Sequence, residues 1–243
     1  MYRKILKIKR CEGAGKESYY EKYEVSFENP KETLSGVLLK LSEENITEKD
    51  PEHEYRPLFW EHSCLQKKCG ACAMVINGEP GMACDTFLND IEEDIIEVEP
   101  LRKFPVIKDL YVDRSFMTES LKDLEVWLNE EALNTGEKIV YEASRCIQCG
   151  LCLEICPNYC VDGIFRGMAA MTQLSFVMAK MKKEEGKEMR KNYRKYVYEG
   201  CGKSLACRNV CPAGVDIENL LVRSNAAAVW NRWNSYIERN EEK

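Results

Sequence analysis

The sequence lacks several features, and each absence excludes a class of protein. Although 44% of its 243 residues are hydrophobic, it holds no run of 18 apolar residues, so we expect no membrane-spanning segment. Lys and Arg number 35 against 41 Asp and Glu, and this acidic balance offers no broad basic face to nucleic acid. Residues 1–10 contain neither an apolar signal core nor a twin-arginine pair, so export is not expected.

Signatures of catalysis are missing as well. The sequence has no nucleophile–base pattern and no Gly-rich phosphate loop of the Rossmann or Walker type. Of its two histidines, His62 lies two residues before Cys64 and is a conceivable metal ligand, but a surface or hydrogen-bonded histidine is the simpler interpretation. Any substrate chemistry must therefore belong to a partner chain.

Cysteine, in contrast, is abundant. The chain has 13 cysteines, an odd number, and most of them lie two to five residues apart in clusters. A disulfide framework would call for an even number and a secreted chain. Clustered cysteines in a chain that is not exported favour metal binding instead.

The first part of the chain, residues 1–105, carries strand signals around a single helix. Alternating apolar residues predict strands, apolar residues at helical spacing predict a short helix, and Asn-Gly is a strong hairpin signal. The expected elements are a strand at 23–27, a helix at 34–41, a strand at 73–76, a turn at Asn77-Gly78 and a closing strand at 95–98. This order favours a small α+β domain of the β-grasp type.

The second part, residues 106–243, has a helical pattern. Helices are expected at 116–128, 165–181 and 219–237, while the densely charged stretch 180–195 is expected to face solvent. The boundary is placed near residues 100–108, where Pro100 and Pro105 interrupt regular structure.

Four cysteines in the first part have the spacing of a plant-type ferredoxin. Cys64, Cys69 and Cys72 form C-x4-C-x2-C, and Cys84 follows, a pattern typical of a [2Fe–2S] cluster. Gly70 permits the tight turns that such a loop needs, and the hairpin at Asn77-Gly78 returns the chain so that Cys84 reaches the same site. Structural zinc is the alternative, but zinc sites usually pair C-x2-C with a second such pair or with histidines.

The second part contains two related cysteine runs. Cys146, Cys149, Cys152 and Cys156-Pro157 form the bacterial ferredoxin run C-x2-C-x2-C-x3-C-P, whose fourth cysteine binds the other cluster in two-cluster ferredoxins. A partner run exists at Cys201, Ser204, Cys207 and Cys211-Pro212, with serine in place of the second cysteine.

Exchanging the fourth cysteines between the runs assigns the ligands. Cys146, Cys149, Cys152 and Cys211 are predicted to hold a [4Fe–4S] cluster. Cys156, Cys201 and Cys207 offer only three thiolates, which predicts a [3Fe–4S] cluster, because a cubane without one thiolate tends to lose that iron. Alternatively, the Ser204 hydroxyl binds a fourth iron, which is less favoured because serine is a harder and less acidic ligand than cysteine.

Two cysteines remain outside these sets. Cys11 and Cys160 are expected to be small buried hydrophobic residues, although Cys160 lies only four positions after Cys156. The predicted fold class is α+β. It consists of an N-terminal β-grasp [2Fe–2S] ferredoxin-like domain (1–105) followed by an all-α, two-cluster bacterial-ferredoxin-like domain (106–243).

Three clusters in this order resemble the iron–sulfur subunits of succinate dehydrogenase and fumarate reductase. Residues 63–74, which read SCLQKKCGACAM, resemble that family's first cluster loop, and residues 99–110 resemble its linker between domains. The resemblance extends from about Lys4 to about Val222. It implies an electron-transfer subunit that lies between an FAD-containing dicarboxylate subunit and a membrane anchor of cytochrome b type that handles quinone. The chain would then be cytoplasmic, held at the inner face of the membrane by that anchor.

Two departures from the family pattern bear on the partners. Residues 65–68 replace an Arg-Glu-Gly sequence of many members, which could retune the first cluster. Cys160 and Gly202 stand where many ubiquinone-linked members place Trp and His, so the resemblance favours menaquinone over ubiquinone here. The alternative is a soluble flavin-dependent reductase that acts on another unsaturated acid, and a structural zinc protein is a remote third hypothesis.

Overall fold

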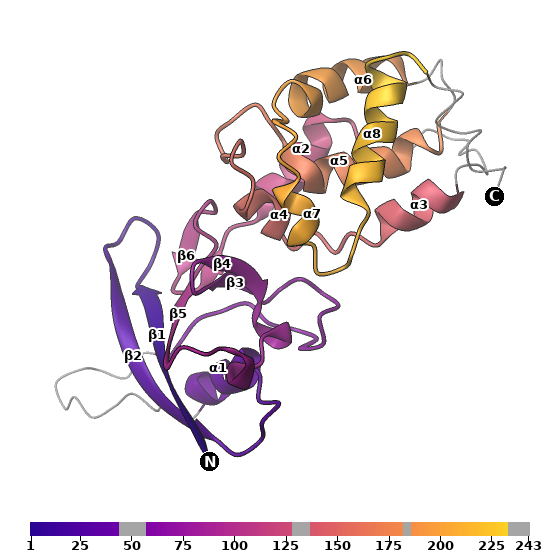
Figure 1. Cartoon of the computed structure of the whole chain (residues 1–243). Helices are drawn as coiled ribbons and strands as arrows, with labels where there is room; N and C mark the ends of the chain where they lie inside the picture. The colour runs from indigo at the N-terminus through magenta and orange to yellow at the C-terminus, as the bar shows by residue number, and fades with distance from the viewer. Residues whose placement is uncertain (44–56, 128–136, 182–185, 233–243) are drawn as a thin grey trace. The chain divides into compact units, whose positions relative to one another are not determined.

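The computed structural model describes residues 1–43, 57–127, 137–181 and 186–232. The chain divides into two compact units, residues 1–113 and 114–243 (Figure 1). The domain limits predicted from the sequence, 1–105 and 106–243, stay a prediction, and residues 106–113 lie with the first unit. Among the described residues, no helix has both the length and the apolar composition that crossing a bilayer requires.

The first unit is built on a mixed five-stranded sheet. Its strands lie in the order β2 (Ser18–Phe27), β1 (Tyr2–Cys11), β5 (Ile95–Glu99), β3 (Ala73–Ile76) and β4 (Glu79–Met82). β1 runs antiparallel to β2 and parallel to β5, and it buries Leu6 and Ile8 completely. In β2 the side chains of Tyr23, Val25 and Phe27 are buried and alternate with exposed ones, so the predicted strand is confirmed.

The hairpin predicted at Asn77-Gly78 is confirmed. Asn77 has φ 46° and Gly78 has φ 84°, and two consecutive positive φ values are typical of the type I′ turn that matches strand twist. The turn joins β3 to β4 in antiparallel register. The chain then enters the short 3-10 helix η1 (Ala83–Asp85), which carries Cys84.

The single predicted helix of this unit is α1 (Leu34–Glu43). Thr33 caps its first turn, because its Oγ1 accepts a hydrogen bond from the Gly36 N–H at 3.1 Å. The helix buries Leu34, Val37, Leu38 and Leu41, the four residues whose spacing predicted it. A second 3-10 helix, η2 (Leu88–Asp90), follows η1.

The segment that leaves the first unit is fixed by Asp109. It turns with φ 48° in a small hairpin between β6 (Val106–Lys108) and β7 (Tyr111–Val112). The Asp109 N–H donates to the Cys11 carbonyl at 2.8 Å, and its carboxylate accepts from the Cys11 N–H at 3.1 Å and the Phe59 N–H at 3.0 Å. These bonds tie the outgoing chain to the end of β1.

The second unit is helical. Its helices are α2 (Ser115–Asp123), α3 (Glu137–Ser144), α4 (Leu151–Glu154), α5 (Gly167–Met178), α6 (Lys187–Tyr193), the π-helical η3 (Arg194–Tyr198), α7 (Ala206–Asn209) and α8 (Ile217–Ala228). α5 is the core helix, with Met171 and Leu174 fully buried, and it contacts α2, α3, α4 and α8. The predicted helix at 165–181 therefore exists and is somewhat shorter.

Two other helix predictions need correction. The helix expected at 116–128, with Phe116, Leu121, Leu124 and Leu128 on its inner face, ends at Asp123. Of that face Leu124 is fully buried just after the helix, whereas Phe116 and Leu121 are only half-buried, and the helix itself buries Met117 and Ser120. Leu128 lies outside the described residues. The helix expected at 219–237 begins at Ile217, because Asp216 caps it by accepting from the Asn219 N–H, and it ends at Ala228.

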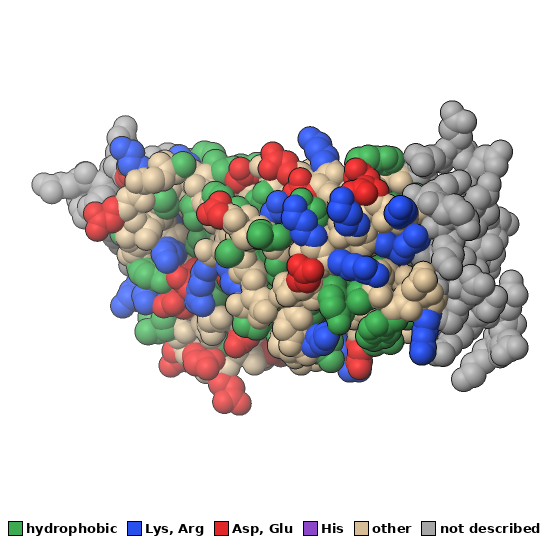
Figure 2. Space-filling view, turned by 90° about the horizontal axis from the view of Figure 1, so that it is seen from above, with side chains coloured by type: hydrophobic (Ala, Val, Ile, Leu, Met, Phe, Trp, Pro, Cys, Tyr) green, Lys and Arg blue, Asp and Glu red, His purple; other side chains and the backbone are tan. Residues whose placement is uncertain are grey.

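The charged stretch is exposed as predicted where the structure describes it. α6 presents Lys187, Glu188 and Lys191 to solvent while it buries Met189 and Tyr193. Figure 2 shows Lys and Arg side chains interspersed with Asp and Glu on the face that it draws. Inside the unit, the Tyr193 hydroxyl donates to Asn225 Oδ1 of α8 at 2.7 Å, so α6 and α8 are joined by a buried hydrogen bond.

Candidate functional site

The first cysteine set lies on one loop and on η1. The Lys67 N–H donates to Cys84 Sγ at 3.2 Å, which links the loop of Cys64, Cys69 and Cys72 to the last cysteine of the set. The N–H groups of Gln66 and Lys68 both donate to Cys64 Sγ at 3.4 Å. Cys69 interacts with Cys64 and Cys72 with Cys84, so the fold brings all four predicted cysteines together.

The backbone of this loop explains why its N–H groups face the sulfurs. Gly70 has φ 81°, in keeping with the turn predicted for it, but Leu65 (φ 55°) and Lys67 (φ 58°) also adopt the left-handed conformation. Such conformations are uncommon for residues other than glycine. They direct the N–H groups of Gln66, Lys67 and Lys68 to the sulfurs of Cys64 and Cys84, and the Lys67 ammonium pairs with the Asp85 carboxylate, one residue beyond Cys84. Nothing in the sequence pattern signalled Leu65 or Lys67.

The thiols of the first set differ in acidity and exposure. Hydrogen bonds from the Gln66 and Lys68 N–H groups lower the pKa of Cys64 to about 7, whereas burial raises the pKa of Cys72 to about 12. Cys69 is exposed while Cys84 is buried. A group held by these four sulfurs would therefore have one side open to solvent or to a partner chain.

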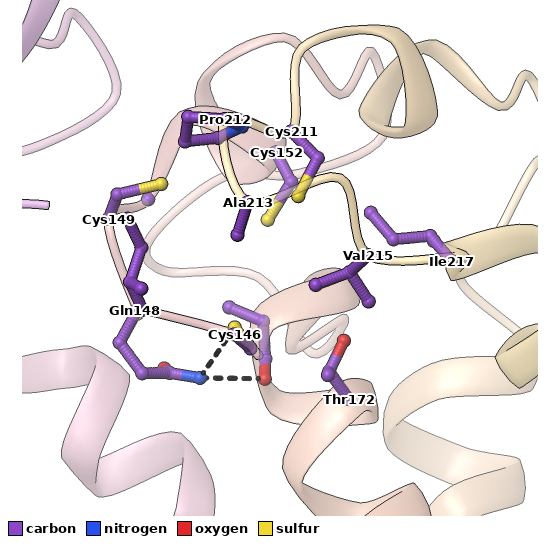
Figure 3. Close-up of a pocket in the computed structure, with 13 residues that line it drawn as sticks. Cys146, Gln148, Cys149, Cys152, Thr172, Cys211, Pro212, Ala213, Val215 and Ile217 are labelled. Carbon is purple, nitrogen blue, oxygen red and sulfur yellow. Dashed lines mark hydrogen bonds between the residues drawn. The ribbon is translucent and has the colours of Figure 1, made fainter. Parts of the chain in front are cut away.

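The second cysteine set lines a pocket in the helical unit. Figure 3 shows the sulfurs of Cys146, Cys149, Cys152 and Cys211 pointing toward a common space, with Ala213, Val215 and Ile217 beside them. Arg145 fixes the wall of the pocket formed by residues 211–213, because its Nη2 donates to the Ala213 carbonyl at 2.6 Å. The segment carrying Cys211 is thereby fastened next to Cys146.

The donor set of this pocket fits an iron–sulfur cluster. Burial raises the pKa of Cys149 to about 11 and the pKa of Cys152 well above its ordinary value. Of the described residues that line the pocket, none carries a positive charge. Four thiolates here would be buried without a cation among the lining residues unless they bound metal, since buried charges need a partner of opposite charge.

The third set, Cys156, Cys201 and Cys207, is also brought together. Burial raises the pKa of Cys207 to about 11, and the charges of Cys156 and Cys201 add to that rise. The charge of Cys207 also contributes to the raised pKa of Cys152 in the second set, so the two sets are neighbours within the unit. Ser204 is exposed on the loop between Cys201 and Cys207.

The two ferredoxin runs have the same backbone conformation. In the first run Gln148 and Gly150 have positive φ values, and α4 follows directly. In the second run the residues at the same positions, Lys203 and Leu205, have φ 57° and 58°, and α7 follows. Ser204 therefore occupies the backbone position that Cys149 has in the first run. The internal repeat read from the sequence is also a structural repeat.

The remaining cysteines and histidine are outside these sets. Cys11 is buried, as expected, and its Sγ donates to the Gly13 carbonyl at 3.1 Å. Cys160 is exposed, so the expectation that it is a buried hydrophobic residue was wrong. His62 packs its ring against Trp60, with 4.5 Å between the ring centroids. Among the described residues, no three His, Cys, Asp or Glu side chains converge closely enough for one metal ion.

Sequence reasoning missed one polar side chain of the second site. Gln148 Nε2 donates to Cys146 Sγ at 3.2 Å and to the Ala169 carbonyl at 3.2 Å (Figure 3). The only sequence signal was a glutamine inside a C-x2-C pair, which by itself predicts no direction for its side chain.

Family comparisons agree with both kinds of site. Residues 5–119 match the family described as a 2Fe-2S iron-sulfur cluster binding domain, and residues 142–215 match the family described as a 4Fe-4S dicluster domain. The first range contains Cys64 to Cys84 and the second contains Cys146 to Cys211. The predicted order, a [2Fe–2S] ferredoxin domain followed by a two-cluster domain, is confirmed.

Individual relatives match most of the chain. It is 32% identical over 236 residues to the succinate dehydrogenase iron–sulfur subunit of Bacillus subtilis, covering 90% of this chain and 89% of that one. It is 28% identical over 218 residues to the fumarate reductase iron–sulfur subunit of Wolinella succinogenes, covering 83% and 86%. It is also 31% identical over 249 residues to an uncharacterised iron–sulfur protein of Methanocaldococcus jannaschii, covering 97% of this chain and 46% of that one.

A solved structure has the same fold. A chain of the Mycobacterium smegmatis Sdh1 complex in the apo form superposes with a TM-score of 0.71 at 24% identity, covering 96% of this chain and 98% of that one. This likeness concerns the fold, whereas the Bacillus subtilis relative matches 90% of the chain at 32% identity. The chain therefore belongs to the family of iron–sulfur subunits of succinate dehydrogenase and fumarate reductase.

Proposed function

We propose that this chain is the electron-transfer subunit of a succinate dehydrogenase or fumarate reductase complex. It relays single electrons between an FAD-containing subunit that handles the dicarboxylate and a membrane anchor of cytochrome b type that handles quinone. The observation that carries this proposal is the gathering of three separate cysteine sets, one in the first unit and two in the second. In such a complex the chain lies on the cytoplasmic face of the inner membrane.

The ligand assignment follows the cysteine sets. In the first unit Cys64, Cys69, Cys72 and Cys84 hold a [2Fe–2S] cluster. In the second unit Cys146, Cys149, Cys152 and Cys211 hold a [4Fe–4S] cluster, while Cys156, Cys201 and Cys207 hold a [3Fe–4S] cluster. The pocket that Cys211 shares with the first run supports the exchange of fourth cysteines. When bound, the clusters supply one-electron carriers.

The chain's own residues hold and tune these centres. Backbone N–H groups of residues 66–68 donate to the sulfurs of the first site and stabilise negative charge there. The apolar side chains of Val215 and Ile217 line the second site and keep water away from it. Arg145 fixes the segment after Cys211. These roles are structural and electrostatic, and the dicarboxylate chemistry belongs to the FAD-containing partner.

The acceptor proposed on the quinone side is menaquinone. Cys160 and Gly202, at the positions where many ubiquinone-linked members have Trp and His, offer neither an indole nor an imidazole N–H. A Cβ added at Gly202 would lie 2.9 Å from Asn158 Nδ2, so the neighbouring amide fills the space beside this glycine. A quinone carbonyl left without its donor loses about 0.5–1.5 kcal/mol of net hydrogen bonding. The intact complex should therefore turn over a menaquinone analogue faster than a matched ubiquinone analogue, and equal turnover would refute this part.

A second candidate function is an electron-transfer chain of a soluble flavin-dependent reductase that acts on another unsaturated acid. The match to a longer iron–sulfur protein of Methanocaldococcus jannaschii, of which this chain spans 46%, shows that the same sequence pattern also occurs outside the named succinate dehydrogenase and fumarate reductase subunits. The same cysteine sets would serve a different partner in that case.

Co-purification tests the proposal. The chain, tagged and expressed in its own host under anaerobic conditions, should bring down an FAD-containing subunit and a haem-containing membrane protein, with about nine iron atoms per chain. Recovery of a flavoprotein without any membrane protein would favour the soluble reductase. Iron near four atoms per chain, or stoichiometric zinc, would refute the three-cluster assignment.

A further inference from the structure

Gln148 is a polar side chain placed against a cluster ligand. It lies between Cys146 and Cys149 with a backbone φ of 51°, and its side-chain amide faces Cys146 (Figure 3). An amide nitrogen has two N–H donors, and the structure uses both. One donates to Cys146 Sγ and the other to the Ala169 carbonyl, each at 3.2 Å (Figure 3).

The bond to Ala169 fixes the direction of the bond to sulfur. Ala169 belongs to the first turn of α5, the core helix of the unit, and is itself buried. A side chain held at a buried helix carbonyl cannot rotate freely, so its second N–H remains aimed at Cys146. Gln173, one turn further along α5, is near enough to the same thiol to act in the direction of a lower pKa.

The internal repeat offers a comparison. Lys203 occupies the position in the second run that Gln148 has in the first. Its ammonium lies over the ring of Tyr198, 5.1 Å from the centroid. The amide contact to a ligand sulfur therefore distinguishes the first run from its structural counterpart.

The electrostatic effect of such a donor has a definite sign. A cluster that accepts an electron gains negative charge, part of which lies on its ligand sulfurs, and N–H donors to those sulfurs set cluster potentials. A donor stabilises the reduced state more than the oxidised state, and the apolar lining of the pocket strengthens the bond. We propose that the Gln148 side-chain amide raises the reduction potential of the cluster held by Cys146, Cys149, Cys152 and Cys211. This inference rests on the proposed function.

Two variants test it in the purified complex. Gln148→Met keeps the length of the side chain but has no N–H, and Gln148→Glu replaces the donor with a carboxylate. In anaerobic redox titrations followed by electron paramagnetic resonance, Gln148→Met should make reduction of the [4Fe–4S] cluster about tenfold less favourable. Tenfold corresponds to a fall of about 59 mV for one electron. Gln148→Glu should lower the potential further.

Asn158→Met is the matched control. Asn158 also follows a cluster cysteine by two positions, but its amide donates to the Gly200 carbonyl at 3.0 Å. Its loss should leave the [4Fe–4S] potential unchanged. An unchanged or higher potential in Gln148→Met, with the cluster retained, would overturn the inference. Wild-type complex without any [4Fe–4S] cluster would instead overturn the proposed function.

If both Gln148 variants lose the cluster, their potentials cannot be compared. A direct measurement of the contact between Gln148 and the cluster then tests the inference. Glutamine labelled with ¹⁵N in the side chain should give a hyperfine coupling to the reduced cluster in Gln173→Met, where Gln148 is the remaining amide at Cys146. Absence of that coupling would show that Gln148 does not donate to the cluster.

Discussion

The guanidinium of Arg10 donates from Nε to Oδ1 of Asp109 at 2.9 Å, and both side chains are 2% exposed. The pair joins the end of β1 to the turn between β6 and β7, 99 positions later in the chain. Burial disfavours the charged guanidinium, but its hydrogen bond to Asp109 and the nearby groups Tyr23, Asp109 and Glu21 keep the pKa of Arg10 above its ordinary value. Removing one member of such a pair leaves the other buried and charged.

Asp109→Ala should therefore destabilise the first unit by about 3 kcal/mol, the lower end of the cost of breaking a buried ion pair, since Arg10 retains Glu21. The measurement is the thermal midpoint of the [2Fe–2S] visible circular dichroism, taken anaerobically at one scan rate. Glu188→Gln is the control, because its pair with Lys191 is exposed on α6, and the midpoint should not change. A midpoint for Asp109→Ala equal to that of the wild type would contradict the prediction.

Glu99 predicts a pH dependence of stability. Burial acts to raise the pKa of its carboxyl, but hydrogen bonds from Arg102, Tyr20 and Lys9 together lower that pKa below its ordinary value of 4.5. A carboxyl whose pKa is lowered by folding contributes stability above its ordinary pKa. That contribution is lost as the pH falls through the lower folded-state pKa.

Glu99→Gln should thus be less stable than the wild type at pH 7, by about 1–3 kcal/mol. The gap in thermal midpoint should close as the pH falls below about 4.5. Glu97→Gln is the matched control on the same strand, because the pair of Glu97 with Lys7 is about one third exposed and is worth less. A gap that stayed constant from pH 7 to acid would show that the charge of Glu99 is not what stabilises the sheet.

Cys211→Ala tests the exchange of fourth cysteines. Although Cys211 belongs to the second run, its sulfur lines the pocket of the first, so the variant should lose the [4Fe–4S] signal. About four iron atoms per chain should be lost with that signal. Cys11→Ala is the control, since Cys11 donates to the Gly13 carbonyl and should be dispensable for iron. Loss of the [3Fe–4S] signal alone in Cys211→Ala would mean that each run binds its own cluster.

Ser204→Cys tests the third centre. Ser204 has the backbone position that Cys149 has in the first run, so a cysteine there supplies the missing thiolate. The variant should gain about one iron atom per chain, lose the oxidised [3Fe–4S] paramagnetic signal and have a lower potential. If the anaerobically prepared wild type already lacks that signal, Ser204 is itself a ligand.

The fold could be predicted wherever local chemistry determines it. The alternation in β2 and the Asn77-Gly78 turn are local signals, and both elements exist. β1 was not predicted, because its lysines and arginines alternate with Leu6 and Ile8 in a segment that reads as charged. Those charges are neutralised by residues far away in sequence, as Lys7 pairs with Glu97 and Arg10 with Asp109. Only the assembled sheet brings these partners together.

The candidate site, too, could be predicted from the sequence only in part. Spacing alone was enough to group the cysteines, because short fixed spacings leave few geometries for a loop around a cluster. The left-handed conformations of Leu65 and Lys67 could not be predicted, since they are uncommon for residues other than glycine and no local pattern marks them. The direction of the Gln148 side chain depends on its hydrogen bond to Ala169 of α5, 21 residues later in the chain, and could not be predicted either.

The pocket closed by Cys211 has a consequence for how the protein is made. Its first three cysteines leave the ribosome early, but the fourth emerges only after α5, α6 and α7 have been synthesised. A cluster delivered during translation would meet three thiols and an open side. On the proposed assignment, the four-cysteine set of this pocket is complete only once synthesis has passed Cys211, so we expect the [4Fe–4S] cluster to be completed after that point.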